Sequence, residues 1–242
     1  MEKILEIENL SKSFGAVFVA DGLNFSLFKG ESLGIIGPNG AGKTSLFNLI
    51  SGSLKPDNGS ILFGGEKIDH LNSPERCNRG ICRSFQIPQP FGGLSVFENT
   101  FVAATHGARL NVNDANNTCI QILEKTGLIS KANELARSLT LLERKRLELA
   151  RALSAKPKVL LLDEIAGGLT ESECKSLIVT INEIKSSGVS IIWIEHIVHA
   201  LLSIVDRLIV INFGKKIADG DPKKIMNSKE VKEIYIGIEA DV

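Results

Sequence analysis

The chain has 242 residues, 43% of them hydrophobic, a length that suits one large hydrophobic core. Its 28 Lys and Arg residues balance 28 Asp and Glu residues, which excludes a global field that recruits nucleic acid or an anionic membrane surface. The opening MEKILEIENL lacks the basic and apolar regions of a secretory signal, and the apolar runs are far shorter than the roughly 20 residues of a membrane span. We therefore expect a cytoplasmic chain that reaches a membrane only by contact.

The first part of the chain is predicted to be rich in strands. Alternating apolar residues in KILEIENL, FVADGLNFSLF and SLGIIG indicate strands over residues 3–10, 18–28 and 32–37. A helix over residues 44–52 follows the third strand, and a further strand is expected near residues 61–63. The third strand therefore leads directly into the glycine-rich segment that precedes the helix.

Helical periodicity replaces the strand signals from about residue 88 to residue 155. SVFENTFVAAT, NNTCIQILEKTGL and ERKRLELARALS are predicted helices, and we interpret the basic run ERKR as a solvated helix face. Strand-length runs return at VLLLDE, VSIIWIEH and DRLIVINF, spaced by helical patterns, as in a mainly parallel sheet. We expect one domain over residues 1–242, with a core of about 1–87 and 156–242 and an inserted helical lobe of about 88–155.

The glycine-rich segment GPNGAGKT matches the pattern GxxxxGK[ST], with a predicted strand before it and a helix after it. Glycines let backbone N–H groups close around phosphate oxygens at a helix N-terminus, where the helix dipole favours anions. Lys43 is expected to reach the β- and γ-phosphates, and Thr44 to place its hydroxyl on Mg²⁺. The residues assigned to this nucleoside triphosphate site are Gly37, Pro38, Asn39, Gly40, Ala41, Gly42, Lys43, Thr44 and Ser45.

Two later strands end in polar side chains. Asp163, at the tip of VLLLDE, is placed to hold Mg²⁺ directly or through water. Glu164 follows and is expected to orient or deprotonate the attacking water; a solvated strand-end acid is the alternative, which the upstream phosphate loop makes less favourable. WIEH delivers His196 to the same carboxyl edge of the sheet, where ligands of α/β folds gather, and a contact with the γ-phosphate is expected.

These motifs occur in the order of the ABC (ATP-binding cassette) transporter ATPases, and the chain resembles their branched-chain amino-acid importer subgroup over its whole length. GPNGAGKT resembles the Walker A motif, SFQ with Gln86 the Q-loop, VLLLDE the Walker B motif with its catalytic glutamate, and WIEH the switch histidine. Phe14, in KSFG, matches the aromatic that stacks on adenine; a core or strand-edge phenylalanine is the alternative. In the family, Gln86 would link Mg²⁺ and the γ-phosphate to the transmembrane partner; its alternative is a surface amide.

The resemblance implies an α/β fold, a P-loop NTPase core with an ABC-type antiparallel β subdomain and an inserted helical subdomain. It implies ATP hydrolysis, with ATP and Mg²⁺ as cofactors and Thr44, Gln86 and Asp163 around the metal. It also implies transmembrane permease subunits and a second ATPase subunit, identical or different, as partners, no nucleic acid, and a peripheral place at the inner face of the cell membrane. Branched-chain amino acids are the leading solute, with urea or another small solute, and a non-transport regulatory or assembly ATPase, as alternatives.

The family signature, usually LSGGQ or LSYGE, reads LTLLE in this chain. In the family this segment binds the γ-phosphate of ATP held by the other subunit. Thr140 keeps a hydroxyl, whereas Leu142 replaces a glycine that lets the backbone approach phosphate. We expect a weakened signature and a preference for a different partner ATPase with an intact one. The residues assigned to it are Thr140, Leu141, Leu142 and Glu143.

The cysteines form no recognisable metal or disulfide motif. Cys77, Cys82, Cys119 and Cys174 include no CxxC pair, and the histidines are scattered. We expect reduced, mostly buried thiols.

Overall fold

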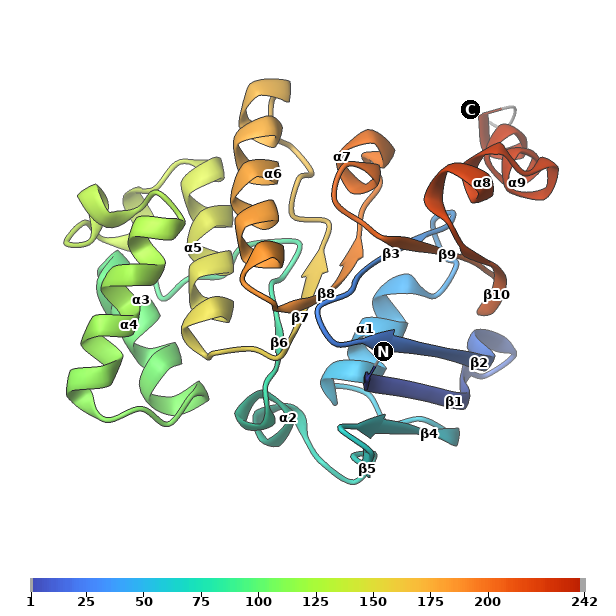
Figure 1. Ribbon diagram of the computed structural model, residues 1–242, viewed down its shortest axis with the longest axis horizontal. Helices are drawn as coiled ribbons and strands as arrows, with labels where there is room; N and C mark the ends of the chain where they lie inside the picture. Colours follow the sequence, from blue (N-terminus) through green and yellow to red (C-terminus); the bar gives the residue numbers. More distant parts are fainter. Residues whose placement is uncertain (1, 240–242) are drawn as a thin grey trace.

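Six strands form a mainly parallel sheet at the centre of the molecule (Figure 1). The computed structural model describes residues 2–239. The strand order is β10-β9-β3-β8-β7-β6; all neighbours are parallel except β9 and β10. The strands are β3 Ser32–Ile36, β6 Ile81–Arg83, β7 Val159–Asp163, β8 Ser190–Ile194, β9 Arg207–Asn212 and β10 Lys215–Gly220. β3, β7 and β8 are buried along their whole length, which explains their continuous apolar sequences.

A second sheet is antiparallel and has the order β2-β1-β4-β5. Its strands are β1 Lys3–Phe14, β2 Val17–Phe28, β4 Asn58–Phe63 and β5 Glu66–Lys67. Apolar and polar residues alternate in β1, as the sequence predicted for a strand. Leu5 and Ile7 face the interior, whereas Glu8 faces solvent. β1 and β2 are longer than the sequence pattern predicted because their pairing continues to Phe14 opposite Val17.

Helix α1 (Lys43–Ser51) lies between the two sheets (Figure 1). Its side chains Leu46, Phe47, Leu49 and Ile50 are completely buried in a core shared by strands of both sheets. Burial of side chains of this size contributes about 1.5–3 kcal/mol each. The helix that begins at the glycine loop is thus also the main packing element between the sheets, which fixes the direction of its N-terminus.

Helices α5 (Leu141–Ser154), α6 (Glu171–Ser186) and α7 (Val198–Leu202) cover the other face of the central sheet, around the buried Trp193. α5 has two apolar sides. Leu149 packs with the central-sheet core, and Leu147 packs with a separate helical core. α5 therefore joins the central sheet to the helices beside it.

The predicted helical lobe contains α3 (Val96–Val102), which continues into a π-helical turn (Ala103–Gly107), and α4 (Val112–Lys125). Figure 1 shows α3, α4 and α5 together at one end of the molecule. Two short 3-10 turns, Ile129–Lys131 and Ala136–Ser138, lead from α4 to α5. The lobe has its own small core, and we keep its limits at residues 88–155 as a proposal.

Several elements lie outside the predicted set, among them the strands β5 and β10 and the helices α2 (Ser73–Arg79), α8 (Pro222–Asn227) and α9 (Lys229–Glu239). α2 begins at a capping box and is anchored by Arg76, whose side chain is completely buried. Its guanidinium donates hydrogen bonds to the carbonyl oxygens of Leu49 (2.7 Å) and Ile50 (2.9 Å) in α1. Within residues 2–239, no helix combines the length and hydropathy that a membrane crossing requires.

Candidate active site

The loop between β3 and α1 is pressed against its neighbours at two glycines. A Cβ atom on Gly37 would lie 2.0 Å from the carbonyl oxygen of Ile211, and one on Gly42 would lie 2.1 Å from that of Val19. The φ angle of Gly42 is 102°, which residues with a side chain rarely adopt. Only glycine at these positions fits the tight curl of the loop, and phosphate binding by its N–H groups stays a prediction.

Lys43 begins α1, and its ammonium group folds back over the loop. Its Nζ donates hydrogen bonds to the carbonyl oxygens of Gly37 (2.7 Å) and Pro38 (2.9 Å). Burial lowers the pKa of Lys43, whereas the nearby carboxylates of Glu164 and Asp163 act in the opposite direction. The cation is therefore held at the loop by two neutral acceptors, and an anionic phosphate would be a stronger partner for it.

A hollow of about 200 Å³ opens above this loop. Val19 and Glu164 line it together with the loop itself. The predicted phosphate-binding residues that line it are Asn39, Gly40, Ala41, Gly42, Lys43, Thr44 and Ser45. The structure thus brings the predicted phosphate grip and the predicted catalytic base to the same place.

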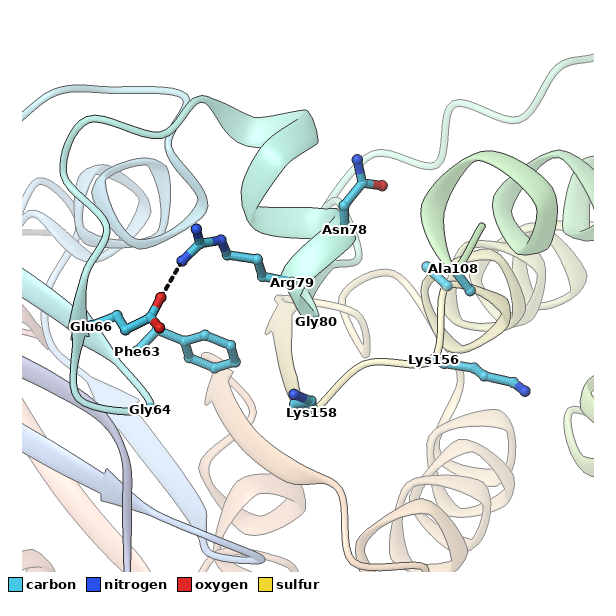
Figure 2. A pocket seen from close by; sticks show the side chains of 10 residues that line it. Phe63, Gly64, Glu66, Asn78, Arg79, Gly80, Ala108, Lys156 and Lys158 are labelled. Atoms are coloured by element: carbon cyan, nitrogen blue, oxygen red, sulfur yellow. Dashed lines mark hydrogen bonds and ion pairs between the residues drawn. The ribbon is translucent and has the colours of Figure 1, made fainter. Parts of the chain in front are cut away.

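A hollow of about 470 Å³ lies at the other end of the central strands, where Gly80 precedes β6 and Lys158 precedes β7 (Figure 2). Arg79 in its wall is already paired with Glu66 at 2.8 Å. Figure 2 shows the side chain of Lys156 pointing away from that pair. The charges of this hollow do not converge, so we place the functional site at the nucleotide loop.

Glu164 is held between the two other residues predicted to act at the γ-phosphate. Its Oε2 accepts a hydrogen bond from Gln86 Nε2 at 2.5 Å, and its Oε1 lies 2.7 Å from His196 Nε2. Its backbone is also unusual, with a φ of 45° in a non-glycine residue. This backbone conformation fixes the direction of the Glu164 side chain. Non-glycine residues with such strained backbone angles are concentrated at functional sites.

Asp163 is buried and paired with Arg83, a residue that the sequence motifs did not single out. Arg83 Nη2 donates to Asp163 Oδ2 at 2.5 Å, and Nη1 donates to Asn48 Oδ1 at 2.6 Å. The guanidinium also lies over the rings of Phe47 (5.5 Å) and Phe85 (5.2 Å). The sequence predicted Mg²⁺ as the partner of Asp163. Because a buried carboxylate needs charge compensation, a basic residue on a neighbouring strand is the signal that could have pointed to Arg83.

Two more charged residues, Glu195 and Lys145, form hydrogen bonds with the backbone of the segments that follow β7 and β8. The carboxylate of Glu195, which is 2% exposed, accepts hydrogen bonds from the backbone N–H groups of Ala166 and His196, both at 3.0 Å. Lys145 donates to the carbonyl oxygen of Glu164 at 3.4 Å. The interpretation of ERKR as a solvated face was wrong for Lys145, which is 5% exposed because α5 turns this side chain toward the loops after β7 and β8.

Phe14 lies at the end of β1, opposite Val17, and the residue is 54% exposed. The ammonium group of Lys12 lies 5.6 Å from the ring centroid. The exposure excludes the alternative of a core phenylalanine. Stacking of this ring on adenine stays a prediction.

The predicted signature residues form the start of α5. Thr140 is the N-cap: its hydroxyl accepts from the N–H of Glu143 (3.4 Å), and the Glu143 carboxylate accepts from the N–H of Thr140 (2.8 Å). Leu141 is exposed, and Leu142 is half-buried. The N-terminal end of α5 therefore presents a hydroxyl and helix amides, but it is flanked by two bulky apolar side chains.

The fold and the site together define a class of protein. A parallel sheet presents a phosphate-binding loop, an acidic strand end and a histidine at one edge, with an antiparallel sheet on one side and a helical lobe on the other. This is the arrangement of an ATP-hydrolysing cassette. A model of the ABC transporter family matches residues 20–167, and the chain belongs to this family.

Its relatives span nearly the whole chain. The high-affinity branched-chain amino acid transport ATP-binding protein LivG of Escherichia coli (strain K12) is 33% identical over 98% of both chains. The lipopolysaccharide export system ATP-binding protein LptB of Haemophilus influenzae is 32% identical over 97% of both chains. The solved ADP conformation of MJ1267, an ATP-binding cassette of an ABC transporter, matches with a TM-score of 0.89 at 32% identity and covers 98% of this chain and 100% of that one. The predicted fold class and ATPase activity are confirmed.

The buried ion pair between Arg83 and Asp163 predicts a strong dependence of stability on both partners. Arg83→Met leaves the Asp163 carboxylate buried without its cation and is expected to lower the free energy of unfolding by about 3–5 kcal/mol. The double variant Arg83→Met, Asp163→Leu is expected to recover most of that loss. Urea unfolding in magnesium-free buffer measures both, and a double variant no more stable than Arg83→Met would contradict the pairing.

Proposed function

We propose that this chain hydrolyses ATP with Mg²⁺ to drive a membrane importer, and that Glu164 activates the attacking water. The catalytic assignment rests on the contacts of Glu164 with Gln86 (2.5 Å) and His196 (2.7 Å) beside the phosphate-binding loop. The transport assignment rests on the 33% identity to a branched-chain amino acid transport ATP-binding protein over 98% of both chains. Both parts agree with the order of motifs in the sequence.

The residues at the site fit a Mg²⁺ ion. Asp163 has one carboxylate oxygen, Oδ1, that is buried and without a hydrogen-bond partner in the part of the chain that the structure describes. The hydroxyl of Thr44 and the amide oxygen of Gln86 supply further hard oxygen donors, as Mg²⁺ requires. When bound, the ion neutralises charge on the β- and γ-phosphates. We assign Thr44, Gln86 and Asp163 to hold it.

The contacts of Glu164 suggest how ATP starts the reaction. Both oxygens of its carboxylate are engaged, one with Gln86 and one with His196. Each contact lowers the basicity of the carboxylate, so the loss of one of them makes Glu164 a stronger base toward water. The γ-phosphate is a strongly charged acceptor that competes for both partners, so its arrival frees Glu164 at the moment when a base is needed.

The second half of each ATP site is proposed to come from another subunit. Thr140, Leu141, Leu142 and Glu143 would face the γ-phosphate held by the partner, through the hydroxyl and the amides at the start of α5. Leu142 keeps that backbone further from the phosphate than a glycine would. We therefore propose a pair with a different ATPase subunit, whose intact signature completes the site on this chain.

Transmembrane permease subunits are the other proposed partners, which would place the chain peripherally on the cytoplasmic face of the membrane. Branched-chain amino acids are the first candidate solute. Other small solutes, of which urea is one, are the second, because the solute contacts lie outside this chain. A third candidate, lipopolysaccharide export, follows from the 32% identity to LptB over 97% of both chains.

The catalytic assignment predicts that Glu164→Gln lowers ATP turnover by about 10²–10⁴-fold, because the amide cannot accept the proton of water. ATP binding is expected to persist, since the loop and Lys43 are unchanged. Glu66→Gln, the same substitution at the remote hollow, serves as the control and is expected to keep full turnover. Single-turnover hydrolysis and equilibrium ATP binding measure the two effects. Unchanged turnover in Glu164→Gln would remove this residue as the base.

The pairing proposal predicts low ATPase activity for the purified chain alone. Addition of a partner ATPase subunit encoded beside it is expected to raise the rate, since the partner supplies the intact signature. Leu142→Gly is expected to raise the rate of the chain alone, whereas Leu135→Gly, at an exposed leucine elsewhere in the lobe, is not. Steady-state ATPase assays test this. A fully active homodimer, unaffected by Leu142→Gly, would contradict the proposal that this chain pairs with a different ATPase subunit.

The transporter proposal predicts that the tagged chain, expressed in its own cells, brings down a protein with several membrane spans. Proteoliposomes that contain this complex are expected to take up labelled leucine on addition of ATP and the matching binding protein. Labelled urea in the same assay tests the second solute. Capture of soluble partners alone would favour a regulatory or assembly ATPase.

A further inference from the structure

We propose that Cys77 and Cys82 form a dithiol site that closes reversibly to a disulfide on contact with a low-molecular-weight disulfide such as oxidised glutathione. Their sulfur atoms lie 3.8 Å apart. Cys77 is in α2 and Cys82 is in β6, and the chain reverses between them at Gly80, which has a φ of 108°. This reversal makes neighbours of two cysteines whose spacing in the sequence matches no disulfide motif.

The two backbone segments are pinned, so the thiols stay close. The buried guanidinium of Arg76, the residue before Cys77, is bonded to the end of α1. The N–H of Gly80 donates to the carbonyl oxygen of Cys77, and the carbonyl oxygen of Gly80 accepts from Val159, both at 2.9 Å. A disulfide requires the sulfurs to approach by about 2 Å, which rotation of the two side chains can supply in large part.

The two thiols differ in access and in ionisation. Both cysteines line a pocket of about 260 Å³, but Cys77 is partly exposed, whereas Cys82 is 3% exposed. The hydrogen bond between them lowers the pKa of Cys77 to about 7, and the same bond together with burial raises the pKa of Cys82. The charged and titratable residues that line the pocket are Arg83, His106, Glu148 and Arg151. Cys77 is therefore the attacking thiol and Cys82 the resolving one.

The reaction balances as a two-electron exchange. The Cys77 thiolate attacks one sulfur of oxidised glutathione and releases one glutathione thiolate, leaving a mixed disulfide. Cys82 then loses its proton to solvent, and its sulfur attacks the Cys77 sulfur, which releases the second glutathione. The bond to the Cys77 thiolate that raised the pKa of Cys82 is absent in the mixed disulfide, so this second step becomes easier. Two protein thiols are oxidised, and one small disulfide is reduced to two thiols.

The position of this dithiol connects it to the ATP site. Cys82 directly precedes Arg83, which holds Asp163, and the same segment continues to Gln86. The Cys77 side chain also faces the helical lobe, since a Cβ on Gly107 would lie 3.6 Å from its sulfur. A disulfide would therefore clamp α2 to β6 at the junction of the core and the lobe, and we expect reversible loss of ATPase activity.

The sequence offers a direct test, because Arg79 lies between the two cysteines. Trypsin separates the peptides CNR and GICR unless a disulfide joins them. After treatment of the full-length protein with oxidised glutathione, mass spectrometry is expected to find the joined pair, lighter by two hydrogens than the sum of the two peptides. Thiol titration in denaturant is expected to fall from the four free cysteines to two, and to return to four with dithiothreitol.

The variant Cys77→Ser is the matched control, because it keeps the buried Cys82 in place. It is expected to keep all of its remaining thiols and its ATPase rate under the same oxidant. A stable glutathione adduct on Cys77, a disulfide between two chains, or four free thiols after treatment would each overturn the site. A joined peptide with an unchanged ATPase rate would overturn its connection to the ATP site.

Discussion

The whole site depends on one geometric constraint: β3, β7 and β8 are parallel neighbours, so the segments that leave their carboxyl ends meet at one edge of the sheet. The glycine loop leaves β3, the acidic pair ends β7, and His196 follows β8. Strands that are buried along their whole length keep these three ends in register. The contacts of Glu164 with residues 78 and 32 positions away in the sequence are a direct result.

Charge pairing keeps this crowded edge stable. Asp163 is matched by Arg83, and the backbone carbonyl of Glu164 is contacted by Lys145, which also lies near Glu195. Each of these buried charges would destabilise the fold if it stood alone. Arg83 comes from β6 and Lys145 comes from α5. The contact of Lys145 with Glu164 therefore connects a helix of the lobe to the end of a central strand.

The departures of the signature from the family pattern are confined to one end of one helix. The leucines of the signature lie at the start of α5, where Leu141 is exposed and Leu142 is half-buried. The Cys77–Cys82 pair lies at the opposite side of the lobe junction, where α2 approaches β6. We propose that the first region influences the choice of partner and that the second responds to oxidants.

The sequence by itself determined the class of fold, the glycine-rich loop between a strand and a helix, and the acidic strand end, because these depend on periodicity and on residues adjacent in the chain. It also placed Glu164, Gln86 and His196 at the site through the order of motifs. Only the tertiary structure decided that Arg83 holds Asp163, that Lys145 is buried, and that two cysteines without a motif are neighbours. Those facts depend on which side of a helix or strand faces a distant segment. Packing decides which groups lie beside a buried charge or thiol, and local sequence patterns do not predict that packing.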